Sequence, residues 1–250
     1  MKRKLALITG GGTGIGQALA WQLAGCGMDI LIVGRREKPL AATQEKFPQT
    51  IKTVIADVAE ARGREAVAEA CGEQPIGYLV HNAAVLEPVE PLAKMTLEAW
   101  RQHMAINVEG PLFLTQILLP HLVGGRILHI SSGAAHHPYA GWGPYCTSKA
   151  ALHMVYQVYR EELKYKQIAI GSARPGVVDT PMQALIRQTP PDRFPKLERF
   201  LQLKENEMLV RPQDAARFLA WLLLDTTDRE FSESEWDIGE AEHRWRTFDA

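Results

Sequence analysis

Two hydroxyl groups and an amine stand at spacings that suit proton transfer. Ser132 follows the apolar run at residues 125–130, and Tyr145 and Lys149 lie four residues apart. On a helix, residues at that spacing lie on one face, and an ammonium group there favours the tyrosinate. A tyrosine whose pKa is drawn from roughly 10 toward the working pH can exchange a proton with a carbonyl or an alcohol. These residues predict acid–base chemistry beside a redox cofactor.

A glycine-rich turn near the start of the sequence predicts where that cofactor binds. Residues 5–8 predict a buried strand, residues 9–16 (TGGGTGIG) a turn, and the residues up to Gly25 a helix. Glycines let the backbone approach a ligand closely, and a helix N-terminus offers free N–H groups and a positive dipole end. Between a strand and a helix, this motif predicts binding of a dinucleotide pyrophosphate.

The end of the second predicted strand, at residues 30–33, bears on which dinucleotide binds. NAD sites usually place an acid there for the ribose 2′-hydroxyl, whereas this chain has Arg35 and Arg36. Two guanidinium groups suit a 2′-phosphate. We therefore expect NADP(H), with NAD(H) less favoured; a plain basic surface turn is the alternative without function.

Apolar runs alternate with helical patterns along the rest of the chain. Further strands are predicted at residues 54–58, 78–81, 125–130, 168–173 and 236–238, and helices at residues 96–122, 145–166 and 211–224. Asp57 is expected near the adenine or, alternatively, as the N-cap of a helix through Ala66. This order predicts one α/β domain over residues 1–250, a Rossmann-type doubly wound parallel sheet of about seven strands with helices on both faces.

Three segments depart from that regular pattern. Pro111 has no N–H for the carbonyl of Asn107, which is either freed to bind something else or marks a plain kink. Residues 177–209 contain four prolines and are expected to be an irregular substrate lid. The tail at residues 232–250 contains Trp236, Trp245 and Phe248. We expect it to pack against protein, such as a subunit face.

Composition excludes several classes of partner. The chain has 250 residues, 46% of them hydrophobic, and a net charge of −1, so no basic field would attract nucleic acid or an acidic membrane. No apolar run approaches the ~18 residues of a membrane span. Three cysteines leave an odd thiol, which predicts a reducing compartment, the cytoplasm.

Two other kinds of chemistry are not expected. His136 and His137 are adjacent, and no acid or cysteine near them in the sequence completes a metal site, so we expect no metal. Ser132 lacks the Gly-x-Ser-x-Gly surroundings of a hydrolase nucleophile.

These motifs together resemble the short-chain dehydrogenase/reductase family over nearly the whole chain. The turn matches at Thr9, Gly10, Gly14 and Gly16; the active-site set matches at Asn107, Ser132, Tyr145 and Lys149, with Ser132 lying 13 residues before Tyr145. The resemblance implies that Tyr145 protonates the carbonyl oxygen, that Ser132 hydrogen-bonds to it, and that Lys149 lowers the pKa of Tyr145 and binds the ribose. It also implies that the Asn107 carbonyl holds a relay water.

The resemblance further implies a set of cofactor-binding residues. They are Gly10, Gly12, Thr13, Gly14, Ile15, Gly16, Arg35, Arg36, Asp57, Val58, Asn82, Ala83, Tyr145, Lys149, Pro175, Gly176, Val178 and Thr180. Two departures are notable. Residues 81–84 (HNAA) lack a glycine that the family usually has, and Thr13 stands where NADPH-preferring relatives often carry a basic residue.

Residues 85–89, 141–145 and 175–183 look most like the branch that contains sepiapterin reductases and benzil reductases. That branch implies reduction of a small ketone, a vicinal dicarbonyl or a pteridine side-chain ketone. Trp142, Met182, Gln183 and Phe194 are expected in the pocket wall, with ordinary core packing as the alternative. The family also implies a homodimer or homotetramer through the helices containing Asn107 and Tyr145. An NAD-dependent alcohol dehydrogenase and a non-catalytic NADP(H)-binding sensor are the alternative functions.

Overall fold

One parallel sheet forms the centre of the protein, whose computed structural model describes residues 4–248. In that part of the chain, seven strands lie in the order β3-β2-β1-β4-β5-β6-β7, and all neighbours are parallel. The strand order reverses between β1 and β4, where doubly wound sheets bind their ligands. The strands are β1 (Leu5–Thr9), β2 (Asp29–Gly34), β3 (Ile51–Ile55), β4 (Ile76–His81), β5 (Arg126–Ile130), β6 (Ala169–Arg174) and β7 (Glu235–Asp237).

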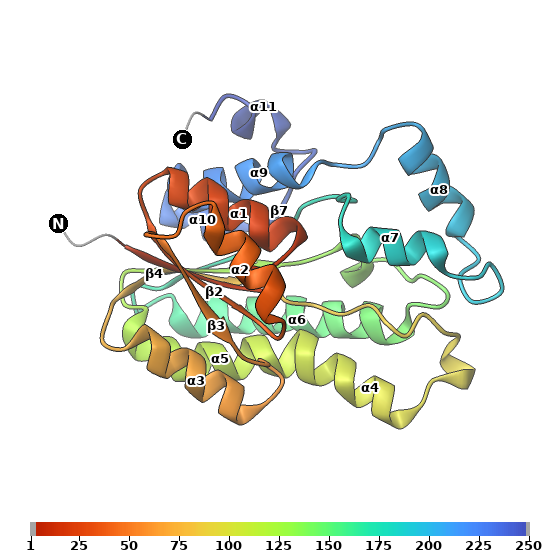
Figure 1. Cartoon of the computed structure of the whole chain (residues 1–250), viewed down its shortest axis with the longest axis horizontal. Coiled ribbons are helices and arrows are strands. Elements are labelled where there is room, and N and C mark those ends of the chain that lie inside the picture. The colour runs from red at the N-terminus through yellow and green to blue at the C-terminus, as the bar shows by residue number, and fades with distance from the viewer. Residues whose placement is uncertain (1–3, 249–250) are drawn as a thin grey trace.

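Helices cover both faces of this sheet, as predicted (Figure 1). The helices α1 and α9 pack together on one face, and α3, α5 and α6 lie on the other. The α-helices are α1 (Gly14–Gly25), α2 (Glu37–Glu45), α3 (Ala61–Cys71), α4 (Leu97–Met104), α5 (Gly110–Leu118), α6 (Gly143–Leu163), α7 (Pro181–Gln188), α8 (Leu197–Glu205), α9 (Pro212–Leu224), α10 (Asp228–Glu233) and α11 (Glu242–Trp245). Among the described residues, no helix is both long enough and apolar enough to cross a membrane.

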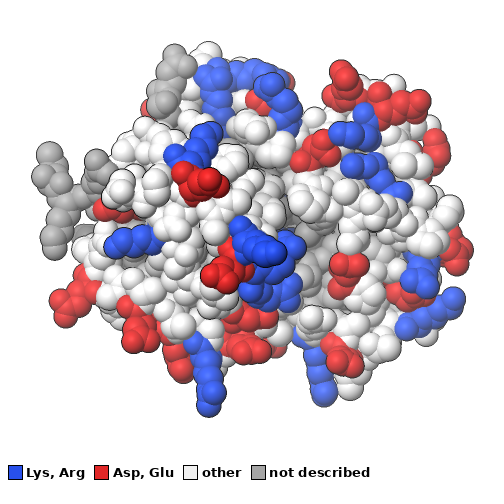
Figure 2. All heavy atoms as spheres, in the orientation of Figure 1, with Lys and Arg blue, Asp and Glu red and all other residues white. Residues whose placement is uncertain are grey.

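The central strands are buried on both sides, which explains their uninterrupted apolar sequences. In β1, Ala6 and Ile8 belong to the core beneath α1 and α9, whereas Leu5 and Leu7 belong to the core on the opposite face. Side chains of a strand alternate between the two faces, so a strand covered by helices on both sides has apolar residues at every position. Charged side chains of both signs are mixed over the outer surface in Figure 2.

The third strand differs from its predicted position. It spans Ile51–Ile55 rather than residues 54–58, because β2 ends at Gly34, which pairs with Ile55. Asp57 accepts a hydrogen bond from the backbone N–H of Ala59 at 3.0 Å. It is not a helix N-cap, because α3 begins later, with Glu60 at that position.

The helical region predicted at residues 96–122 is present but divided. Thr96 caps α4 by accepting a hydrogen bond from Ala99 N at 3.2 Å, and α5 begins at Gly110 with Pro111 in its first turn. Between them lies the π-helical turn η2 (Ala105–Glu109), which contains Asn107. Turns of this kind are frequent at functional sites. Short 3₁₀ turns also occur at η1 (Leu92–Lys94), η3 (Leu119–His121) and η4 (Gly133–Ala135).

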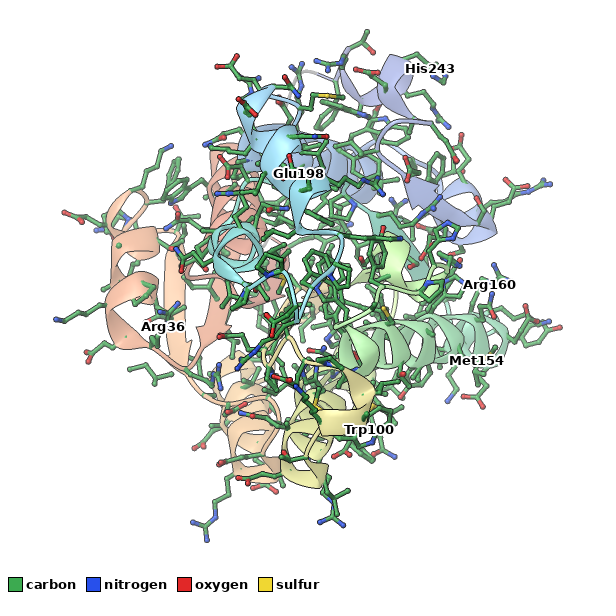
Figure 3. All side chains as sticks on the ribbon, turned by 90° about the vertical axis from the view of Figure 1, so that its right-hand side faces the viewer. Arg36, Trp100, Met154, Arg160, Glu198 and His243 are labelled. Carbon is green, nitrogen blue, oxygen red and sulfur yellow. The ribbon has the colours of Figure 1, made fainter. Side chains whose placement is uncertain are left out.

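Residues 177–209 are more regular than predicted, because they contain α7 and α8. Pro181 does not break the chain but occupies the first turn of α7, whose N-cap Thr180 accepts a hydrogen bond from Gln183 N at 3.4 Å. A parallel bridge between Val178 and Val210 closes the base of the segment. Figure 3 looks at the side that α7 and α8 cover, with Glu198 of α8 facing the viewer.

The C-terminal tail packs on its own chain rather than requiring a partner subunit. Trp245 is buried and its indole N–H donates to Ile238 O at 2.9 Å. The rings of Trp236 and Trp221 meet edge to face, with centroids 5.3 Å apart. The tail therefore completes the core over α9; its last two residues lie outside the described part of the chain.

Candidate active site

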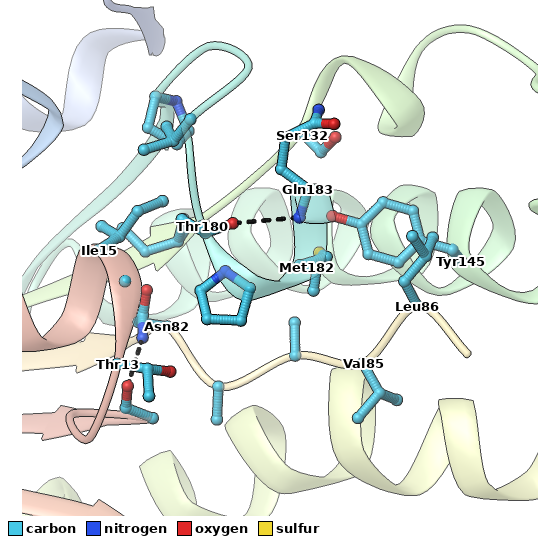
Figure 4. A pocket seen from close by; sticks show the side chains of 18 of the residues that line it. Thr13, Ile15, Asn82, Val85, Leu86, Ser132, Tyr145, Thr180, Met182 and Gln183 are labelled. Carbon is cyan, nitrogen blue, oxygen red and sulfur yellow. Dashed lines mark hydrogen bonds between the residues drawn. The ribbon is translucent and has the colours of Figure 1, made fainter. Parts of the chain in front are cut away.

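A cavity of about 560 Å³ opens at the carboxyl ends of the strands (Figure 4). The turn after β1, the ends of β2, β4, β5 and β6, the start of α6 and the segment containing α7 all contribute to its wall. Most of the predicted site residues line it: Gly10, Gly12, Thr13, Gly14, Ile15, Arg35, Arg36, Asp57, Val58, Asn82, Ala83, Ser132, Trp142, Tyr145, Lys149, Pro175, Gly176, Val178, Thr180, Met182 and Gln183. Gly16 and Asn107 are not among the lining residues.

The glycine-rich turn leaves backbone groups facing the cavity. Gly10 has a φ of +68°, in the left-handed region that favours glycine. Asn82 holds the turn in place, because its side-chain amide donates to Thr9 O at 2.9 Å and to Gly10 O at 3.2 Å. The helix α1 then begins without a side-chain cap from Thr13, which leaves its first N–H groups available to an anion.

Gly16 does not line the cavity, but it lies against the glycine-rich turn. A Cβ atom at this position would lie 2.4 Å from Gly10 O and 2.5 Å from the side chain of Asn82. The residue is therefore needed for α1 to approach the turn closely, rather than for direct contact with a ligand.

Two arginines border the end of the cavity next to β2. The side chain of Arg35 is 53% exposed, and its guanidinium lies 3.7 Å from Asp57 Oδ2. Arg36 precedes α2 and is also exposed; Figure 3 shows it on the flank of the site opposite α6. Neither guanidinium is buried, so both can turn toward an anionic ligand without a large desolvation cost.

Ser132, Tyr145 and Lys149 meet at the other end of the cavity. The Tyr145 hydroxyl points into it (Figure 4), and the side chain of Ser132 is close enough to lower the pKa of Tyr145. Ser132 Oγ accepts from Ala134 N at 3.1 Å, which leaves the hydroxyl proton of Ser132 free to be donated. Lys149 is buried, and its ammonium donates to Ile130 O at 2.7 Å. Its Nζ lies 5.8 Å from the centre of the Tyr145 ring.

The charge states of this group differ from the sequence prediction. Burial raises the pKa of Tyr145 to about 12, and the hydrogen bond with Ser132 only partly opposes that rise; Lys149 is not among the causes. Burial also lowers the pKa of Lys149 to about 8, opposed by the negative charge of Glu235. The phenol therefore stays protonated at neutral pH, which is the form that can donate a proton.

Asn107 links two elements behind the cavity. Its side-chain oxygen accepts from Val85 N at 2.9 Å, and its amide donates to Val85 O at 3.0 Å and to Ser148 Oγ at 2.9 Å. Ser148 in turn donates to Tyr145 O at 2.9 Å. The side chain thus fixes the loop after β4 against α6, and with it the backbone that presents Tyr145.

An apolar compartment adjoins the Tyr145 hydroxyl. The Trp142 ring lies edge to face with the Tyr145 ring at a centroid distance of 5.8 Å and stacks on Phe194 at 4.9 Å. Phe194 is fully buried behind Trp142 and is not part of the cavity wall, so the alternative of core packing is correct for it.

Sequence reasoning missed several residues of this compartment. They are Leu86, Tyr139, Ile186 and Phe200. The helical periodicity of residues 197–205 could have indicated Phe200. Leu86 and Tyr139 lie in loops, and Ile186 lies in α7, which like α8 was not predicted.

Three polar residues outside the cavity also come together. His136, His153 of α6 and Glu235 of β7 place their ligating atoms within 4.8 Å of one another. No metal site was expected because no acid lies near His136 in the sequence, but the fold brings Glu235, 99 positions away, beside it.

Comparison with known proteins accounts for a cavity that joins a glycine-rich turn to Ser132, Tyr145 and Lys149. A family model described as short chain dehydrogenase matches residues 4–191. The chain belongs to the short-chain dehydrogenase/reductase family. This short-chain dehydrogenase/reductase is therefore an oxidoreductase, and its family binds a nicotinamide cofactor.

Several relatives of this short-chain dehydrogenase/reductase match along most of their length. It is 33% identical over 233 residues to "Benzil reductase ((S)-benzoin forming)" of Bacillus cereus, which covers 88% of this chain and 94% of that protein. It is 29% identical to a "Probable NADP-dependent dehydrogenase" of Haemophilus influenzae, over 89% of this chain and 88% of that protein. The crystal structure of a short chain dehydrogenase/reductase from Saccharomyces cerevisiae superposes with a TM-score of 0.86 at 31% identity, covering 94% and 95% of the two chains.

Proposed function

We propose that the protein is an NADPH-dependent carbonyl reductase that reduces a small ketone, a vicinal dicarbonyl or a pteridine side-chain ketone. One observation supports this above all: the hydroxyls of Ser132 and Tyr145 and the buried ammonium of Lys149 meet in a cavity that continues to a glycine-rich turn. A carbonyl oxygen between the two hydroxyls accepts hydrogen bonds from both of them.

Tyr145 is proposed as the general acid. The nicotinamide, when bound, supplies a hydride to the carbonyl carbon. Negative charge then develops on the carbonyl oxygen, and Tyr145 donates its proton there while Ser132 donates a hydrogen bond. The raised pKa of Tyr145 favours this direction, because the phenol carries its proton before the reaction. Lys149 supplies positive charge near the developing phenolate and an ammonium for the cofactor ribose.

The proposed dinucleotide site fits a pyrophosphate at one point and a 2′-phosphate at another. The first turn of α1 offers N–H groups beside Gly10 and Gly12, where glycine permits close approach of a ligand. Arg35 and Arg36 stand where an acid would bind the 2′-hydroxyl of NAD. The NADP named for the Haemophilus influenzae relative agrees with this preference.

The apolar compartment suggests the substrate class. Aromatic rings of Tyr139, Trp142 and Phe200 and the side chain of Ile186 line the cavity next to Tyr145. Such a wall favours a ketone with aromatic or other apolar substituents, and the benzil reductase of Bacillus cereus is similar along most of its length. We further propose that residues 177–209 act as a lid, because Met182 and Gln183 line the same wall.

The decisive experiment compares two tyrosine variants on the same helix. NADPH oxidation is followed with benzil, diacetyl, phenylpropanedione, sepiapterin and a simple monoketone. Tyr145→Phe should lower kcat by at least ~100-fold while NADPH still binds, because only the proton donor is lost. Tyr156→Phe is the control, since Tyr156 is also buried in α6 but does not line the cavity. Substantial turnover by Tyr145→Phe would refute the mechanism.

The cofactor comparison tests the alternative of an NAD-dependent alcohol dehydrogenase. Michaelis constants are measured for NADPH and NADH in reduction and for NADP and NAD in oxidation. A lower constant for NAD and faster oxidation would favour the alternative. Tight NADPH binding with no turnover on any ketone would instead favour the sensor function.

We propose that the protein forms a homo-oligomer in which α5 and α6 form the interface between subunits. Phe113 and Ile117 of α5 and Met154 and Val158 of α6 are exposed apolar side chains, with Met154 56% exposed. Figure 3 shows Met154 on the outer side of α6, away from the cavity. Large exposed apolar side chains gathered on neighbouring helices favour burial against another subunit.

A further inference from the structure

Three separate elements direct potential metal ligands at one point outside the cavity. His136 follows η4, His153 lies in the middle of α6, and Glu235 begins β7. His136 Nε2 lies 2.6 Å from Glu235 Oε2, and His153 Nδ1 lies 3.1 Å from Glu235 Oε1. The carboxylate therefore stands between two imidazoles, each facing a different oxygen.

We propose that His136, His153 and Glu235 form a binding site for one divalent transition-metal ion, with Zn²⁺ the best match. Two imidazole nitrogens and one carboxylate are ligands that Zn²⁺ binds in proteins. Zn–N bonds of about 2.0–2.1 Å separate tetrahedral ligand atoms by about 3.3 Å. The three ligand atoms here lie within 4.8 Å of one another, so small side-chain rotations bring them to that spacing.

The surroundings of His153 support a ligand role. Its Nε2 atom lies 3.1 Å from the side-chain amide of Gln157, one turn further along α6. With a metal on Nδ1, the proton of His153 moves to Nε2, and the Gln157 amide turns to accept it through its oxygen. Metal-binding histidines almost always have such a partner on the second ring nitrogen, and it fixes the orientation of the ring.

The local charge also favours a cation. Arg174 is the cation in contact with Glu235, at 3.3 Å, but it also lies 3.5 Å from Asp237 and 3.8 Å from Glu240. Three carboxylates thus share one guanidinium. The buried ammonium of Lys149 also interacts with Glu235, so three negative charges face two positive ones. A divalent ion on Glu235 leaves Arg174 paired with the other two acids and offsets the remaining negative charge.

Access to the site is from solvent. The side chain of His136 is 34% exposed, whereas those of His153 and Glu235 are 17% and 8% exposed. An ion can therefore enter beside His136, and a water can complete the tetrahedron there. Neither histidine lines the main cavity, so metal binding does not depend on the proposed reductase function.

Direct binding measurements test this site. The full-length protein is treated with a chelator, dialysed and titrated with Zn²⁺ by calorimetry and with Co²⁺ by visible spectroscopy, which detects tetrahedral coordination. We expect one ion per chain. Glu235→Gln and His136→Gln should each weaken binding by at least about 10-fold. Because Glu235 is buried, the thermal midpoint of each variant without metal is compared with that of the wild type.

His137→Gln and Cys146→Ser are the matched controls. His137 is next to His136 but outside the cluster. Cys146 is a partly buried thiol, a side chain of a type that can bind metals, and its Sγ lies 3.9 Å from His137 O. Both controls should bind Zn²⁺ as the wild type does. Absence of stoichiometric binding to the wild type would overturn the proposal, as would unchanged binding by folded His136→Gln, because the ion would then lie elsewhere.

Discussion

Replacing Lys149 with methionine should stabilise the fold and abolish turnover. The side chain is 4% exposed, and burial lowers its pKa from 10.5 to about 8. A shift of this size means that the charged form costs about 3.4 kcal/mol in the folded state at neutral pH. Methionine has a similar length and no charge, but it loses the hydrogen bond to Ile130 O, worth about 1 kcal/mol. The expected gain is about 2 kcal/mol.

Thermal unfolding at several pH values is the assay. For a chain of this size, about 2 kcal/mol corresponds to a rise in Tm of roughly 4–8 °C near pH 7. The folded-state pKa of Lys149 lies below the unfolded value, so the wild type gains stability as pH rises from about 8 to about 10.5, while the variant does not. The difference in Tm should therefore shrink through that range and vanish or reverse near its upper end.

The control is Lys166→Met, an exposed lysine just beyond the same helix, which should leave Tm nearly unchanged at every pH. Protein concentration is kept constant, since an oligomer makes Tm depend on it. A Lys149→Met variant that is less stable than the wild type near pH 7 would refute the reasoning. A difference in Tm that does not change between about pH 7 and about pH 10 would refute it as well.

Three further substitutions test the two ends of the cavity. Arg35→Asp should raise KM for NADPH by at least ~10-fold and change KM for NADH little, because a carboxylate repels a 2′-phosphate; equal effects on both cofactors would contradict this. Gly16→Ala should lower stability by ~1–3 kcal/mol in thermal unfolding and weaken NADPH binding, since its Cβ would lie 2.4 Å from Gly10 O. Gly25→Ala in the same helix has open space and should not destabilise. Trp142→Ala should cost ~3–5 kcal/mol of stability and raise KM for aromatic ketones; an unchanged KM would place the substrate elsewhere.

Local sequence signals predicted the elements and most cavity residues. The strands that begin at residues 5, 29, 76 and 126 were predicted to within two residues of their starts, because strands buried on both faces are uninterrupted apolar runs. The glycine-rich turn located one end of the cavity and the residues around Tyr145 the other. The third strand was misplaced, because pairing with β2, which ends at Gly34, decides where it stops.

Segments whose structure depends on distant contacts were predicted less well. The prolines of residues 177–209 predict an irregular chain, yet Pro181 lies in the first turn of α7, which Thr180 caps. The composition of the tail predicts packing against protein, such as a subunit face, and the structure places its tryptophans against α9 of the same chain. The deciding contact of the tail lies outside the segment itself. The cap of α7 is local, but residues 177–209 are also held from outside by the stacking of Phe194 on Trp142.

The sequence by itself determined the family and the sheet. It also determined which residues place hydroxyl, amine and guanidinium groups in the cavity, because all of these depend on short motifs and on periodicity. Only the tertiary structure decided the charge states of these residues and which distant residues lie beside them. The pKa values of Tyr145 and Lys149 depend on burial, which is produced by the whole fold. Likewise, His136 meets Glu235 only once the fold has brought together two segments that are 99 residues apart in the sequence.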